Sequence, residues 1–129
     1  MLNEPLSNAL VNIKNNEEIG KPNCRIKPAS NLIKAVLQSM QDEGYIAGFE
    51  YVDNGKGGEF KVNLVGKINK CRAIRPRLPV KVSDIERYEK VYLPGKGFGT
   101  LILSTPHGVM THEEAKEKKT GGVLLSYVY

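Results

Sequence analysis

The residues best suited to chemistry lie between positions 104 and 116. Ser104 and Thr105 end an apolar run, Pro106 and Gly108 predict a tight turn, and a helix is expected to begin a few residues later. Hydroxyls and exposed backbone amides can contact the edges and sugars of RNA bases that are splayed from their stack. This stretch is therefore a candidate contact for irregular RNA, and an ordinary strand–turn–helix connection is the simpler alternative.

The expected helix start adds an anion-binding feature. Thr111 and Glu114 have the spacing of a capping box, in which each side chain satisfies a backbone N–H group of the other residue. A helix N-terminus also presents unpaired N–H groups and the positive end of the helix dipole, and both favour phosphate.

A row of asparagines is the second candidate. Asn8, Asn12, Asn15 and Asn16 share one side of a helix predicted over residues 5–16, roughly opposite its apolar stripe. Asparagine is a mediocre helix former, because its amide competes for backbone hydrogen bonds. The amides could meet ribose hydroxyls and phosphate oxygens, and a neutral surface is an equally good interpretation.

Basic side chains are the third candidate, and they could bind phosphate. The cluster in the middle of the chain comprises Lys67, Lys70, Arg72, Arg75, Arg77 and Lys81, and Lys14, Lys27 and Lys34 add to the first half. Side chains alternate between the faces of a strand, so one sheet face cannot hold the whole central cluster. A solvated basic surface is the alternative.

Enzymatic motifs are weak. The segment that begins at His112 starts like a zinc protease motif but lacks the second histidine. The glycines at 95, 97 and 99 lack the spacing of a phosphate-binding loop, and Ser104 with His107 has no third partner for a hydrolase triad. The sequence therefore predicts no catalytic residue, no metal ion and no cofactor.

Composition indicates a folded protein with an anionic partner. The chain has 129 residues, 40% of them hydrophobic and 26% charged, and a formal net charge of +5. No apolar run is long enough to span a bilayer. Cys24 and Cys71 belong to no CxxC pair, and we expect reduced thiols in a cytoplasmic protein.

Residues 1–65 predict an N-terminal α/β domain with the order helix, strand, helix, hairpin. Ser30 is the expected N-cap of the second helix, and Gly44 is its expected end. The predicted helices cover 5–16 and 30–43, and the predicted strands cover 23–27, 45–52 and 59–65.

Residues 66–129 predict a C-terminal β-rich, RNA-binding domain with short helices. We expect Pro76 and Pro79 to interrupt its first strand and Ser83 to cap a helix. The predicted strands cover 67–74, 100–104 and 123–129, and the predicted helices cover 84–93 and 111–119. The fold class is α+β, with two small α/β halves packed together.

The stretch from Gly99 to Lys116 resembles the signature of the family of small-subunit ribosomal protein number eight. The matching frame is Gly99, Ile102-Leu103, Ser104-Thr105, Gly108-Val109-Met110 and Ala115-Lys116. Further similar segments follow the family's order, namely Pro5 to Leu10, Ile26 to Ser30, Gly44 to Ile46 and Gly121 to Tyr129. Residues 82–93 look like the archaeal and eukaryotic branch of that family.

The resemblance implies a non-enzymatic protein that binds an irregular stem in the central domain of small-subunit ribosomal RNA and assists its assembly. Its other partners would be neighbouring ribosomal proteins in a cytoplasmic ribosome. By position, the core of the stem would meet Ser104, Thr105, Pro106, His107, Gly108 and Glu114. The RNA backbone nearby would meet Asn8, Asn12, Asn16, Lys27, Ser30 and Lys34.

Two other classes of function remain open from the residues alone. One is a small α/β enzyme that uses the turn between Ser104 and Glu114 as an anion pocket. The other is a protein-interaction module whose basic cluster meets acidic partners. Phosphate-driven RNA binding should weaken steeply with salt, whereas a small-substrate pocket should respond much less.

Overall fold

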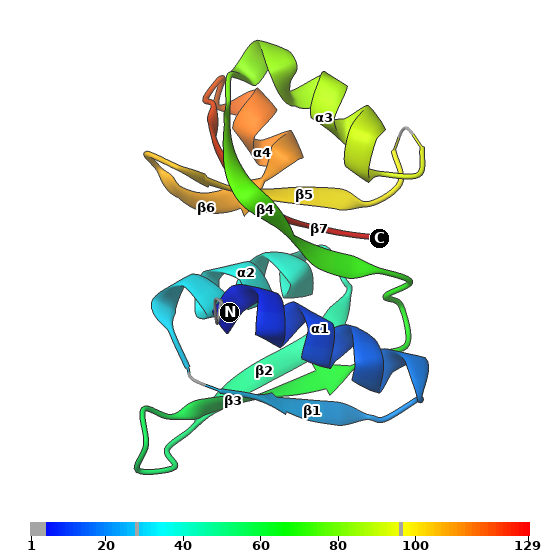
Figure 1. Ribbon diagram of the computed structural model, residues 1–129, viewed down its shortest axis with the longest axis vertical. Helices are drawn as coiled ribbons and strands as arrows, with labels where there is room; N and C mark the ends of the chain where they lie inside the picture. The colour runs from blue at the N-terminus through cyan, green and yellow to red at the C-terminus, as the bar shows by residue number, and fades with distance from the viewer. Residues whose placement is uncertain (1–4, 28, 96) are drawn as a thin grey trace. The chain divides into compact units, whose positions relative to one another are not determined.

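The computed structural model describes residues 5–27, 29–95 and 97–129, and the chain divides into two compact units, Met1–Cys71 and Arg72–Tyr129 (Figure 1). Each unit combines helices with a β-sheet, which confirms the expected α+β fold class. Pro28, which belongs to one of the family-like segments, lies outside the described residues.

The first unit is a three-stranded antiparallel sheet with two helices over one of its faces (Figure 1). The strands are ordered β1-β3-β2, so β2 is an edge strand. The elements are α1 (Pro5–Glu18), β1 (Asn23–Ile26), α2 (Asn31–Asp42), β2 (Ile46–Val52) and β3 (Glu59–Leu64).

The core of this unit follows from the helical periodicity of the sequence. Leu6, Leu10 and Ile13 form the buried stripe of α1, as expected, and Val36 and Met40 lie on the buried face of α2. The predicted cap of α2 is confirmed, because the side chain of Ser30 accepts a hydrogen bond from the backbone N–H of Ile33 at 3.2 Å.

The second unit is a four-stranded sheet in the order β4-β7-β5-β6, and it carries α3 and α4. Side chains from both helices and from all four strands form its core, and they include Ile74, Ile85, Leu103, Met110, Ala115 and Leu124. The elements are β4 (Cys71–Val80), the 3-10 helix η1 (Val82–Asp84), α3 (Ile85–Tyr92), β5 (Thr100–Thr105), β6 (Gly108–Thr111), α4 (His112–Glu117) and β7 (Gly122–Val128).

Two expectations for this unit were wrong. The strand β4 continues through Pro76 and Pro79, because it lies at the edge of the sheet, where a residue without an N–H group is tolerated. Ser83 does not cap the helix, because it lies inside η1, and Asp84 occupies the N-cap position of α3.

Candidate nucleic-acid interface

The β5–β6 hairpin presents a short, braced tip. Thr105 pairs with Gly108 across the hairpin, so Pro106 and His107 form the exposed tip between them. The buried Thr105 hydroxyl donates to the carbonyl of Gly108 at 2.8 Å and accepts from the backbone N–H of His107 at 3.1 Å. Thr105 therefore fixes the shape of the tip, and Pro106 and His107 are the residues that it presents to solvent.

Two adjacent glycines let the start of β7 lie close to the strands on either side of it. A Cβ atom on Gly122 would collide with the carbonyl oxygen of Ser104 and come within 3.1 Å of the Thr105 methyl carbon. A Cβ atom on Gly121 would collide with the carbonyl oxygen of Val80. From the sequence, this glycine pair was predicted only to precede the last strand. Its close packing against other strands was not predicted, because those strands are distant in the sequence.

The start of α4 is capped differently from the expected box. The Thr111 side chain accepts from the backbone N–H of Glu114 at 3.3 Å, which confirms half of the prediction. The carboxylate of Glu114, however, accepts from the Thr111 hydroxyl at 3.3 Å. This contact holds the exposed carboxylate beside the helix start, where it favours hydrogen-bond donors such as ribose hydroxyls over phosphate.

His112 is a buried structural residue. Its Nδ1 accepts from the backbone N–H of Leu101 at 3.1 Å, and its Nε2 lies 3.5 Å from a carboxylate oxygen of Glu89, which also pairs with Lys116. Burial lowers the pKa of His112, against an opposing effect of the Glu89 carboxylate. The neutral ring, protonated on Nε2, therefore links β5 to α3 and α4.

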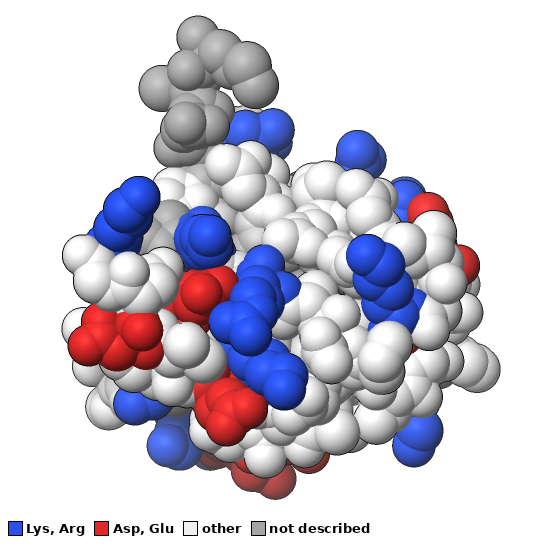
Figure 2. Space-filling model, turned by 90° about the horizontal axis from the view of Figure 1, so that it is seen from below, with Lys and Arg blue, Asp and Glu red and all other residues white. Residues whose placement is uncertain are grey.

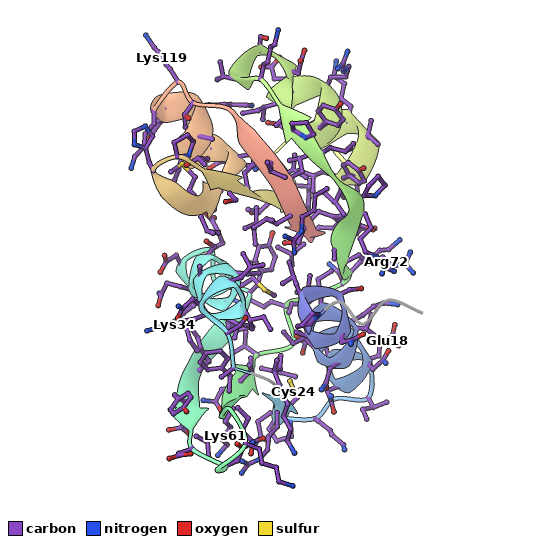
Figure 3. All side chains as sticks on the ribbon, turned by 60° about the vertical axis from the view of Figure 1, so that its left-hand side comes forward. Glu18, Cys24, Lys34, Lys61, Arg72 and Lys119 are labelled. Carbon is purple, nitrogen blue, oxygen red and sulfur yellow. The ribbon has the colours of Figure 1, made fainter. Side chains whose placement is uncertain are left out.

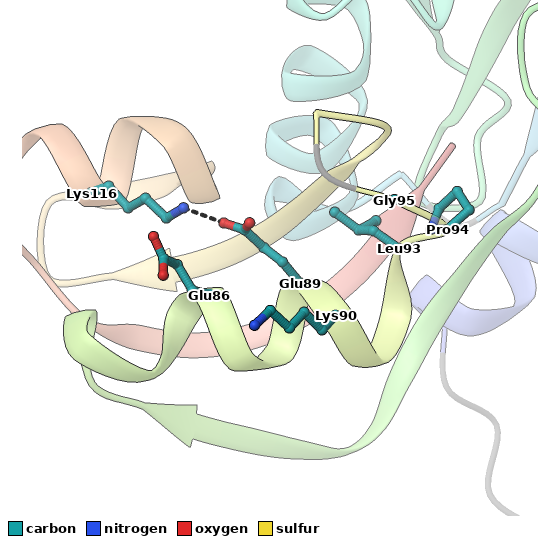
Figure 4. A pocket seen from close by; sticks show the side chains of 7 residues that line it. All are labelled: Glu86, Glu89, Lys90, Leu93, Pro94, Gly95 and Lys116. Atoms are coloured by element: carbon teal, nitrogen blue, oxygen red, sulfur yellow. Dashed lines mark ion pairs between the residues drawn. The ribbon is translucent and has the colours of Figure 1, made fainter.

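A cavity of about 310 Å³ in the second unit lies apart from the hairpin residues (Figure 4). Two glutamates and two lysines give it mixed charge, and an ion pair joins Glu89 to Lys116 within it. Its lining is Glu86, Glu89, Lys90, Leu93, Pro94, Gly95 and Lys116. This lining includes neither the hydroxyls of Ser104 and Thr105 nor the tip residues Pro106 and His107. The cavity therefore does not supply the anion pocket that an enzyme at this turn would need.

In the first unit, part of the asparagine row supports the fold. The side-chain amide of Asn12 donates to the backbone carbonyl of Arg25 at 2.9 Å, and this bond ties α1 to β1. The side chain of Asn16 donates to the backbone carbonyl of Asn12 at 2.8 Å. Asn8, one turn earlier, is exposed. A partner would thus meet Asn8 more readily than Asn12 or Asn16.

Two expected cationic contacts are accessible on this unit. Lys27 is exposed directly after β1, and Lys34 is exposed on the first turns of α2, where Figure 3 shows its side chain projecting from the helix. Lys14 instead pairs with Glu18 at 3.3 Å along α1. Lys27 and Lys34 are therefore better placed than Lys14 to meet phosphate.

The charges on the first sheet are mixed. Arg25 pairs with Glu59 at 3.4 Å, and Glu50 lies opposite Lys61 across the β2–β3 ladder. On the face of the molecule that Figure 2 shows, blue basic and red acidic side chains are interspersed among uncharged ones. The net charge of +5 is thus not gathered into one uniform field there.

Both cysteines are free and buried in the first unit. Burial raises the pKa of Cys24 to about 11 and that of Cys71 to about 12, and the Cys71 thiol donates to the carbonyl of Leu10 at 3.3 Å. Among the described residues, no three side chains of the metal-binding types gather, and no helix is long and apolar enough to cross a membrane.

These features define a small α+β protein with an exposed, braced hairpin tip on one unit and exposed amide and lysine groups on the other, groups of the kinds that contact nucleic acid. Residues 4–129 match the family described as Ribosomal protein S8, and the chain belongs to this family. It is accordingly a structural ribosomal protein that binds ribosomal RNA, and the family is not one of enzymes. Its partners are ribosomal RNA and other ribosomal proteins.

Proposed function

We propose that this chain binds an irregular stem in the central domain of small-subunit ribosomal RNA and helps to organise that domain during assembly, in a ribosome of the archaeal or eukaryotic type. The observation that carries the proposal is the β5–β6 hairpin, whose tip is exposed while the Thr105 hydroxyl braces it from inside. A rigid tip loses little conformational freedom when it binds, so it suits an RNA surface of fixed irregular shape.

The proposed contacts divide by chemistry. Ser104, Pro106, His107, Gly108 and Glu114 would meet bases and sugars in the irregular part of the stem, because they offer hydroxyl, ring, backbone and carboxylate groups. On the first unit, Lys27 and Lys34 would meet phosphates, and Asn8 would meet ribose or phosphate oxygens. Thr105, Ser30, Asn12 and Asn16 would act mainly by holding these elements in place.

The direct test is selective binding to a panel of short ribosomal RNA stems. The panel contains the irregular central-domain stem, a fully paired version of it and an unrelated stem, each measured across a salt series. We expect the irregular stem to be preferred. Equal affinity for all three stems, in a folded sample, would contradict the proposal.

Two variants test which residues read the RNA. We expect Ser104→Ala to reduce the preference for the irregular stem, whereas Lys27→Ala should weaken binding to all stems about equally, since a phosphate contact carries no sequence information. Equal loss of preference in both variants at one salt concentration would remove the assignment to the hairpin.

A further inference from the structure

A groove of about 460 Å³ in the first unit is used by none of the hairpin contacts. It lies between α2 and the outer strand β2, and its volume is in the range of small-ligand sites. Its lining consists of Ala29, Ser30, Asn31, Lys34, Gln38, Gln41, Phe49, Tyr51 and Phe60.

Tyr51 forms an exposed aromatic surface in this groove. The residue is 60% exposed, although its ring packs edge-on against Phe60 with the centroids 6.2 Å apart. The backbone of Gly58 lies so close to the ring that a Cβ atom there would collide with it. The backbone N–H of Ala29 donates to the Gly58 carbonyl at 3.1 Å, which fixes that backbone. The ring is therefore held in place while much of it remains open to solvent.

The polar side chains around this ring suit a nucleotide. Lys34 is exposed and could meet a phosphate, and the Gln41 amide can hydrogen-bond to the edge of a base. The Gln38 side-chain amide donates to the Asp42 carboxylate at 3.0 Å, and its carbonyl oxygen can still accept from a base. The lining itself contains no carboxylate, and the Asp42 carboxylate beside it is engaged by Gln38. A hydrophobic peptide would need a more apolar lining than one rich in amide, hydroxyl and ammonium groups.

We propose that the groove binds one unpaired nucleobase of RNA, stacked on Tyr51, with the adjoining phosphate at Lys34. This inference rests on the proposed function, and it adds a stacked base beside the phosphate contact already proposed at Lys34. Stacking on an aromatic ring tolerates any base, because every base has a π face. The site would therefore capture a bulged or single-stranded nucleotide whatever its sequence.

The first experiment is a nuclear magnetic resonance titration of the full chain with single-stranded hexa-adenylate, with a short perfectly paired duplex as the comparison. We expect hexa-adenylate to shift the signals of Tyr51, Phe49 and the Gln38 side chain, and the duplex to leave them in place. Failure of hexa-adenylate to shift them, while the irregular stem still binds, would overturn the groove and leave the proposed function intact. Failure of every RNA to bind would overturn both.

The second experiment measures variants against hexa-adenylate. Tyr51→Leu keeps an apolar side chain at the sheet edge but removes the π face, and we expect it to weaken binding about 5-fold or more. Tyr51→Phe should bind within about twofold of the wild type, because it keeps the ring. The matched control is Phe98→Ala, which removes an aromatic side chain that is 69% exposed in the other unit and should have no effect.

Unchanged binding by Tyr51→Leu would overturn the inference. If that variant does not fold, Lys34→Gln replaces it, and binding equal to wild type would again count against the groove. Displacement of the groove signals by an apolar peptide, but not by hexa-adenylate, would assign the groove to a protein partner instead.

Discussion

At the scale of single residues, two adjacent hydroxyls have different tasks. The Thr105 hydroxyl is hydrogen-bonded to the backbone of its own turn, at Gly108 and His107. Ser104 is half-buried at the end of β5, between Val109 on one neighbouring strand and Val123 on the other. The first hydroxyl shapes the hairpin, and the second is proposed to meet RNA.

This difference predicts that only one of the two hydroxyls matters for stability. Thr105→Val should lower the free energy of unfolding by about 1–3 kcal/mol, because both hydrogen bonds of the Thr105 hydroxyl to the turn backbone are lost, and it should also weaken RNA selectivity. Ser104→Ala should change stability by less than about 0.5 kcal/mol while still reducing selectivity. Urea denaturation of both variants checks this, and an equal destabilisation would contradict the division of tasks.

His112 predicts a stability that depends on pH. Its pKa is lowered by burial in the folded chain, whereas the unfolded chain takes up the proton near the ordinary value of 6.5. The stabilisation is therefore present above about pH 6.5 and is lost as the pH falls below it. Protonation of Nδ1 would also abolish its bond from the Leu101 N–H.

The measurement is the free energy of unfolding at about pH 7.5 and about pH 5.5. The wild type should lose more stability on acidification than His112→Asn, whose side-chain oxygen can still accept from Leu101. Glu89, Glu113 and Lys116 are present beside position 112 in both proteins, so their own titration largely cancels in the comparison. Parallel losses in the two proteins would refute the role of the histidine.

At the scale of elements, the sheet of the second unit depends on the glycine at the start of β7. Gly122 lies where any Cβ atom would strike the backbone of β5 at Ser104. We expect Gly122→Ala to destabilise the chain by about 1–3 kcal/mol and to disturb the hairpin, because the strands must move apart. Gly48→Ala is the matched control, since nothing lies within 4 Å of a Cβ atom there. Thermal unfolding of both variants tests this. Similar shifts of the melting temperature in the two variants would argue against the packing role of Gly122.

Local patterns predicted the helices well, and non-local neighbours explain what they missed. The stripe of α1 and the cap at Ser30 could be read from spacing, because both are settled within a few residues. The continuity of β4 through Pro76 depends on its edge position, which only the strand order reveals. The bond from Asn12 to Arg25 likewise joins residues of different elements.

The candidate site shows the same division. The turn at 106–107 and half of the cap at Thr111 were predicted from the sequence. The groove around Tyr51 was not, because it needs α2, β2 and β3 side by side. No spacing rule connects Lys34 with Tyr51.

At the scale of the whole molecule, the charge balance sets how salt should act. The excess of 19 basic over 14 acidic residues is modest, and the ion pairs of Arg25 and Lys14 engage part of it. Affinity for every stem should fall as salt rises, because phosphate contacts release counterions. The preference for the irregular stem should persist, because it is attributed to mostly uncharged hairpin groups.

Binding curves between about 50 and 200 mM salt test this expectation. The logarithm of the affinity should decline with parallel slopes for the irregular and the regular stem. If the ratio of the two affinities approached one at the higher salt, the selectivity would itself be electrostatic. It would then be assigned to the lysines and not to Ser104.

The buried thiols allow local opening of the structure to be measured by chemical modification. Cys24 and Cys71 are the only cysteines of the sequence, and both belong to the first unit. In the closed state they are protonated and covered, so an alkylating reagent can modify them only when the surrounding structure opens. The rate of modification at Cys24, followed with and without bound RNA, would thus time the opening of the first unit, with no label to introduce and no residue to replace.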